Sequence, residues 1–118
     1  MPIASALGLI LASTPVYLAD TPVFRSYALA SDLSVTAVAI IEDSRCETPA
    51  PCFGRDRLLV AAVVRDRGHD WEYSAELGEP IFLREGVLTL VDTATPPREG
   101  SAIPLSRYRL DWVFEPYE

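Results

Sequence analysis

Residues 33–65, LSVTAVAIIEDSRCETPAPCFGRDRLLVAAVVR, decide the fold, because they place a short cysteine-containing loop between two apolar runs. Residues 33–42 and 57–65 are rich in Val, Ile and Ala and are apolar on both faces of an extended chain. β-Branched residues favour strands, and strands apolar on both faces are typical of the middle of a sheet. We therefore predict two central strands, the most buried of the domain.

Further strands are expected on either side of this pair. Residues 22–30 read as an edge strand with Pro22 at its entry, and residues 71–77, 81–83, 86–92 and 107–115 read as later strands. The residues expected to face inward in the later strands are Trp71, Tyr73, Ala75, Leu77, Tyr108, Leu110, Trp112 and Phe114. A polar turn at residues 66–70 and a long Pro-containing loop at residues 93–106 separate strands. The pattern predicts an all-β antiparallel sandwich, Ig-like in the broad sense, with about seven strands.

Length and composition restrict the function. The 118 residues allow one domain, expected over residues 21–118, and 49% apolar residues are enough for a packed core. The net charge of −7 argues against nucleic acid as a partner, because phosphate binding needs a clustered basic surface. All ten basic residues are Arg, so a Lys nucleophile and a Walker-type phosphate loop are excluded.

The N-terminus allows two interpretations. Residues 4–12 (ASALGLILA) have the length of a signal-peptide hydrophobic region and are too short for a transmembrane span. However, no Lys or Arg precedes them, and the cleavage site before Asp20 is poor. Residues 1–20 are therefore either a signal peptide or anchor-like segment, or the first ordinary element of the domain.

The two cysteines, Cys46 and Cys52, form a Cys-x5-Cys pair, which in an exported protein predicts a disulfide closing a short loop. A structural zinc site needs four ligands, and the chain has two Cys and one His. A catalytic thiol needs a base, and His69 lies on a separate turn. We expect no metal and no cofactor, and a periplasmic or secreted location.

The segment Glu42-Asp43-Ser44-Arg45-Cys46, followed by Cys52-Phe53-Gly54, resembles a hallmark of small bacterial envelope proteins, E-D-S-R-C-P, a spacer and C-x-W-A-G. Residues 77–80 (LGEP), 86–91 (GVLTLV) and 108–110 (YRL) are also similar. The chain departs from the hallmark at Glu47, where proline is usual, and at Phe53-Gly54, which lacks the tryptophan. The resemblance implies a secreted or lipoprotein-like β-sandwich and implies no activity.

The charged residues beside the cysteines form a candidate binding loop of Glu42, Asp43, Arg45, Phe53 and Arg55. Three interpretations remain open. Asp43 or Ser44 could cap a turn while Arg45 pairs with an acid across the loop. Adjacent carboxylates could instead contribute to a Ca²⁺ site, or the loop could present Arg45 or Phe53 to a partner.

The sequence contains no nucleophile and base that we would pair, so we expect no enzyme. The leading hypothesis is an exported, non-enzymatic module that binds or stabilises another envelope protein. One alternative is a secreted peptidase inhibitor presenting residues 46–52. Another is a Ca²⁺- or small-ligand-binding domain built on Glu42 and Asp43. The loop at residues 93–106 is either a protein-contacting loop or a simple crossover between sheets.

Overall fold

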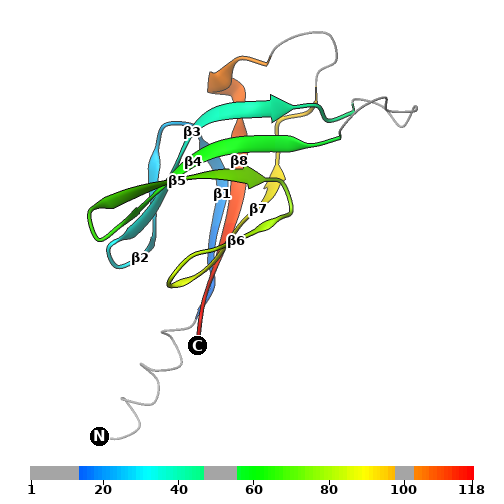
Figure 1. The fold of residues 1–118 in the computed structure, drawn as a ribbon. Coiled ribbons are helices and arrows are strands. Elements are labelled where there is room, and N and C mark those ends of the chain that lie inside the picture. The colour runs from blue at the N-terminus through cyan, green and yellow to red at the C-terminus, as the bar shows by residue number, and fades with distance from the viewer. Residues whose placement is uncertain (1–13, 47–55, 98–102) are drawn as a thin grey trace, which may run out of the picture.

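A computed structural model describes residues 14–46, 56–97 and 103–118 (Figure 1). The described residues form eight strands and one 3-10 turn and contain no α-helix. In chain order these are β1 (Val16–Pro22), β2 (Ser26–Ala30), β3 (Leu33–Asp43), β4 (Leu58–Asp66), β5 (His69–Glu76), β6 (Pro80–Phe82), β7 (Gly86–Thr93), η1 (Leu105–Arg107) and β8 (Arg109–Pro116).

The strands form two antiparallel sheets of four, ordered β1-β8-β7-β6 and β2-β3-β4-β5. Inward-facing residues of both sheets belong to one hydrophobic cluster, an arrangement compatible with the predicted sandwich. The expectation of about seven strands was wrong by one. Residues 22–30 do not form a single strand, because Phe24 adopts a positive φ of 70° and ends the extended path between β1 and β2.

The pair β3 and β4 occupies the middle of its sheet, as their sequences predict. Leu33 pairs with Asp66 at one end of the pair and Asp43 pairs with Leu58 at the other. Along most of β4 and the first half of β3, buried residues alternate with half-buried ones, so one face contributes to the core and the other is partly covered. The register of β3 shifts after Ala37, and residues 39–43 contain no buried side chain. Small and β-branched side chains suit this position because they pack closely on a pleated surface.

The last strand supplies the largest core side chains. Trp112 and Phe114 are 2% and 1% exposed, and Tyr108 and Leu110 are also buried, so the predicted inward face of β8 is confirmed. These residues pack against the inward faces of β3, β4 and β7 within one cluster. Burying an aromatic or aliphatic side chain of this size stabilises the fold by about 1.5–3 kcal/mol.

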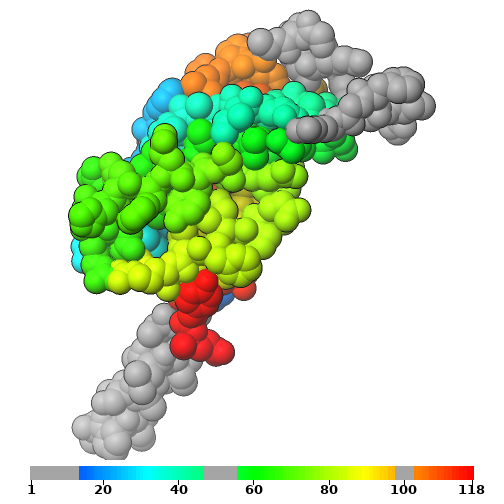
Figure 2. Space-filling view, viewed as in Figure 1, coloured from blue at the N-terminus to red at the C-terminus, as the bar shows by residue number. Residues whose placement is uncertain are grey.

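The molecule has two ends with different contacts. The loop end contains Asp43, Cys46, Asp56, Thr95 and Arg107, and the hairpin end contains Leu33, Asp66, His69 and Arg84. Figures 1 and 2 show the C-terminal residues, in red, on the side of the molecule away from the end of β3 and from η1, in orange.

The turn at the hairpin end has the expected chemistry. Arg67 and Gly68, the two residues between β4 and β5, both have positive φ values, 50° and 81°. This is the backbone of a type I′ turn, whose twist matches the two strands it joins. Gly68 takes this conformation without strain, and the turn fixes the register that pairs Asp66 with His69.

The N-terminal boundary differs from the sequence expectation. β1 begins at Val16 and pairs with β8, with Val16 opposite Phe114 and Tyr17 opposite Val113. The boundary expected after Asp20 therefore falls inside a paired strand. Residues 1–13 lie outside the described part of the chain, and the signal-peptide interpretation stays a prediction. Within the described ranges, no helix has the length and hydrophobicity to cross a membrane.

Candidate functional site

The predicted binding loop begins where β3 ends. Glu42 and Asp43 are the last two residues of β3. Ser44 extends the pairing with the β4 side beyond the end of β3, because its N–H donates to the carbonyl of Arg57, the residue before β4, at 2.8 Å. The N–H of Cys46 donates to Asp56 Oδ1 at 3.0 Å. The two stems of the loop are therefore held together through Cys46 and Asp56.

Asp43 and Arg45 form a two-point ion pair. Arg45 Nε lies 2.8 Å from Asp43 Oδ1 and Arg45 Nη2 lies 2.9 Å from Oδ2. Their side chains are 11% and 12% exposed, so water screens the pair little. Among the described residues, Arg45 thus forms its ion pair with a carboxylate on its own stem and with no acid across the loop.

Two contacts connect this pair to the other sheet. The Tyr108 hydroxyl donates to Asp43 Oδ2 at 2.7 Å, and Arg45 Nη1 donates to the carbonyl of Thr95 at 2.8 Å. Thr95 follows β7 and Tyr108 precedes β8, so both contacts reach the second sheet. Asp43 and Arg45 lie on one chain segment, so their bonds to Tyr108 and Thr95 hold three segments in fixed positions.

The protonation states follow from these contacts. Burial alone would raise the pKa of the Asp43 carboxyl, but hydrogen bonds from Arg45 and Tyr108 outweigh burial and hold that pKa below its usual value. Burial and the bond to Asp43 raise the pKa of the Tyr108 phenol well above its usual value. Asp43 is therefore ionised and Tyr108 is a neutral donor across the physiological pH range.

Glu42 belongs to a second, more exposed group. Arg57 Nε lies 3.2 Å from Glu42 Oε2 without hydrogen-bond geometry, and Arg57 Nη1 lies 3.7 Å from Glu76 Oε1. The Ser44 hydroxyl donates to Glu42 Oε2 at 2.8 Å. Glu42 is thus the acid that pairs across the loop.

These contacts bear on the calcium hypothesis. Both Asp43 oxygens accept hydrogen bonds from Arg45, and Glu42 faces Arg57 and Ser44, so neither carboxylate is directed at an open site. Among the residues that the structure describes, no group of three or more His, Cys, Asp or Glu could hold a metal ion. The remaining predicted residues, Cys52, Phe53 and Arg55, lie outside the described ranges. The Cys46–Cys52 disulfide therefore stays a prediction.

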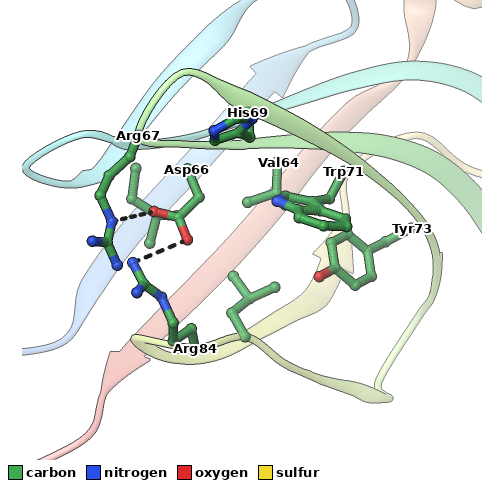
Figure 3. Close-up of a pocket in the computed structure, with 9 residues that line it drawn as sticks. Val64, Asp66, Arg67, His69, Trp71, Tyr73 and Arg84 are labelled. Carbon is green, nitrogen blue, oxygen red and sulfur yellow. Dashed lines mark ion pairs between the residues drawn. The ribbon is translucent and has the colours of Figure 1, made fainter.

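A pocket of about 520 Å³ lies at the hairpin end, between β5 and the turn joining β6 to β7 (Figure 3). The residues lining it are Leu33, Val64, Asp66, Arg67, His69, Trp71, Tyr73, Leu83 and Arg84. Its base is apolar and buried, because Leu33, Val64 and Leu83 are each less than a tenth exposed. Its charged residues lie together on one side and its aromatic residues on the other (Figure 3).

The sequence did not indicate this pocket. Trp71 was expected in the core, but it is 58% exposed. It faces inward as the alternation requires, yet β5 is an edge strand and β6, at the edge of the other sheet, has only three residues to cover it. The sequence signal that could have been used is the spacing of His69, Trp71 and Tyr73, which places three large polar or aromatic side chains on one face of β5.

Comparisons with known proteins add no functional information. No family model, curated protein or solved structure matches this chain.

Proposed function

We propose that this protein is an exported, non-enzymatic domain, Ig-like in the broad sense, that binds another envelope protein through the loops at its loop end. The observation that carries the proposal is the hydrogen bond from Arg45 Nη1 to the Thr95 carbonyl, at 2.8 Å. This bond connects the stem of the cysteine loop to the stem of the Pro-rich loop.

The second loop has equally firm stems. Thr95 Oγ1 donates to the carbonyl of Arg107 at 3.1 Å and accepts from the N–H of Arg109 at 2.9 Å. Thr93 Oγ1 donates to the carbonyl of Arg109 at 2.6 Å. The residues on either side of the Pro-rich loop are therefore fixed to each other and, through Arg45, to the stem of the cysteine loop.

Fixed stems matter for binding because they reduce the conformational entropy that is lost when loops engage a partner. Loops presented at one end of a β-sandwich are a common binding arrangement. The predicted Cys46–Cys52 disulfide would restrict the first loop further, by about 2–2.5 kcal/mol in the chain-entropy model. Export is supported by this cysteine pair and by the resemblance to envelope proteins.

We propose that the domain has no enzymatic activity because its buried charged residues are bonded to one another. In the part of the chain that the structure describes, Asp43 accepts hydrogen bonds from both Arg45 and Tyr108. A catalytic acid or base must instead reach a substrate proton. The acidic net charge of −7 makes nucleic acid an unfavourable partner.

The test is capture of a specific protein from a periplasmic extract by covalent cross-linking to the purified domain. We expect the captured protein to be lost when Phe53→Ser and Arg55→Glu are introduced together. Arg65→Glu, an equal charge reversal at the opposite end of β4, is the matched control and should capture normally. Capture that survives the loop double variant and is lost with the control would contradict the proposal.

The same fixed stems would also suit a peptidase inhibitor, which presents a stiff loop to an active site. Residual activity of serine, cysteine and metallopeptidases, measured with excess domain, distinguishes the two functions. Inhibition that disappears when the Cys46–Cys52 pair is replaced by serine would assign the loop end to peptidases. Unaffected peptidases, together with a captured non-peptidase protein, would support the envelope-binding function.

A further inference from the structure

We propose that the pocket at the hairpin end binds a small organic anion with a flat apolar body, such as an aromatic monocarboxylate. This site is separate from the loop end, since Leu33 and Asp66 lie at one end of the β3–β4 pair and Asp43 and Leu58 at the other. The two proposals can therefore fail independently.

The size and lining of the pocket fit such a ligand. A volume of about 520 Å³ lies within the range of small-molecule sites, which are lined mostly by apolar and aromatic side chains with a few polar groups. Leu33, Val64 and Leu83 form a buried apolar base. A flat apolar body placed there would exclude water from these side chains.

The aromatic side of the pocket adds shape selectivity. Trp71 and Tyr73 lie next to each other on β5 and project towards the pocket, with the Tyr73 hydroxyl directed to its interior (Figure 3). Trp71 is 58% exposed, which is unusual for the largest apolar side chain and leaves its ring available for stacking. A planar ligand would cover this ring without displacing any part of the core.

The charged side favours an anion. Asp66 lies between two arginines, with Oδ1 3.6 Å from Arg67 Nε and Oδ2 3.5 Å from Arg84 Nη2. The Asp66 side chain is 17% exposed, whereas both arginines are 58% exposed. The outermost charges of the pocket are therefore positive, on a protein whose net charge is −7.

The arginines retain hydrogen-bonding capacity for a ligand. Arg84 Nε also donates to Glu85 Oε1 at 3.1 Å, but a guanidinium carries five N–H donors in a planar fork. The contacts to Asp66 are longer than the 2.8 Å contact between Arg45 and Asp43, so they leave room for rearrangement. A ligand carboxylate that binds both Arg67 and Arg84 on their exposed side would add a second negative charge to this cluster of two arginines and Asp66.

The experiment measures binding of 2-naphthoate to the whole protein by ¹H–¹⁵N NMR. The chain has two tryptophans, Trp112 in the core and Trp71 in the pocket, so their two indole N–H signals separate pocket binding from a global change. We expect the Trp71 signal to shift and the Trp112 signal to stay, with a dissociation constant in the millimolar range or below, as is usual for a ligand of this size.

Matched ligands and variants test each half of the site. The neutral 2-naphthalenemethanol should bind about three to five times more weakly, and Arg67→Gln should remove that preference for the carboxylate. Arg65→Gln, an exposed arginine of the same hairpin that does not line the pocket, should keep it. Trp71→Ala should abolish binding, while Phe82→Ala, an exposed aromatic outside the pocket lining, should not.

Three results would overturn the proposal. The first is an unshifted Trp71 signal at millimolar naphthoate in the folded protein. The second is equal affinity for the acid and the alcohol, which would make the pocket purely apolar. The third is a concentration-dependent dimer, seen by sedimentation, that is lost in Trp71→Ala, since the pocket would then be the contact between two copies of the chain. Because Trp71 is largely exposed, this variant is expected to fold.

Discussion

The two ends of the molecule use the same residue types for different purposes. At the loop end, Asp43 is bonded by Arg45 at 2.8 and 2.9 Å and by Tyr108 at 2.7 Å, and the side chains of Asp43 and Arg45 are about a tenth exposed. At the hairpin end, Asp66 lies between Arg67 and Arg84 at 3.6 and 3.5 Å, and both arginines are largely exposed.

Burial and geometry account for the difference. The two carboxylates are similarly buried, since Asp43 is 12% and Asp66 is 17% exposed, but Arg45 is 11% exposed whereas Arg67 and Arg84 are 58% exposed. A guanidinium and a carboxylate that are both desolvated must satisfy each other's charge within the protein, so the loop-end group is tightly bonded and connects the two sheets. An exposed ion pair contributes little to stability and can exchange partners. We conclude that the loop-end group is structural and that the hairpin-end group is available to a ligand.

The largest expected effect is that of Asp43→Asn. This change leaves Arg45 without its counter-charge in a poorly solvated position, and we expect it to lower the free energy of unfolding by about 3 kcal/mol. Urea denaturation followed by circular dichroism measures the change. A loss below about 1 kcal/mol would place this pair among ordinary surface ion pairs and remove the contrast between the ends.

The contribution of Asp43 should depend on pH. Because its pKa is lower in the folded state than in the unfolded state, the stabilisation is complete above the unfolded pKa and is lost as pH falls through the folded one. The difference in stability between wild type and Asp43→Asn should therefore be constant near neutral pH and shrink below about pH 4. Urea midpoints measured across that interval check this, and a difference that grows on acidification would contradict it.

A smaller effect is expected for Tyr108→Phe. The ring stays in the core while the hydrogen bond to Asp43 is lost, which should cost about 1–2 kcal/mol. Thermal unfolding by calorimetry measures it. Tyr117→Phe, which alters an exposed tyrosine, is the control and should leave the melting temperature unchanged.

The smallest effect is expected for Asp66→Asn at the hairpin end. Its two ion pairs involve arginines that are 58% exposed, so the loss of stability should be at most about 1 kcal/mol. The same urea series as for Asp43→Asn provides the measurement. Equal losses for the two aspartates would show that the ends do not differ in the way proposed here.

The strands could be predicted largely because their signals are local. Strand signals can be read from neighbouring residues alone. Examples are the alternation of Tyr108, Leu110, Trp112 and Phe114 and the apolar runs of β3 and β4. β1 is not predicted as a strand in its own right, because residues 1–20 allow either a signal peptide or a first element of the domain and Pro22 is assigned to the next strand. Its strand character depends on pairing with β8.

The site was harder to predict because its contacts are not local. Asp43 and Tyr108 are 65 positions apart, and Arg45 and Thr95 are 50 apart. The sequence identified Glu42, Asp43 and Arg45 as a charged group, but their partners depend on how the two sheets meet. The exposure of Trp71 could not be predicted from the sequence either, because it results from the shortness of β6 on the opposite sheet.

The pairing of the first and last strands also determines how the domain would be oriented on a surface. Val16 lies opposite Phe114, while Pro22 lies opposite Arg109 near the loop end. The chain therefore enters β1 and leaves β8 on the same side, away from the loop end (Figures 1 and 2). Tethering through either flank would direct the loops outward and turn the hairpin end towards the attachment surface. A tethered domain would then meet large partners on its outer side and small solutes beneath it.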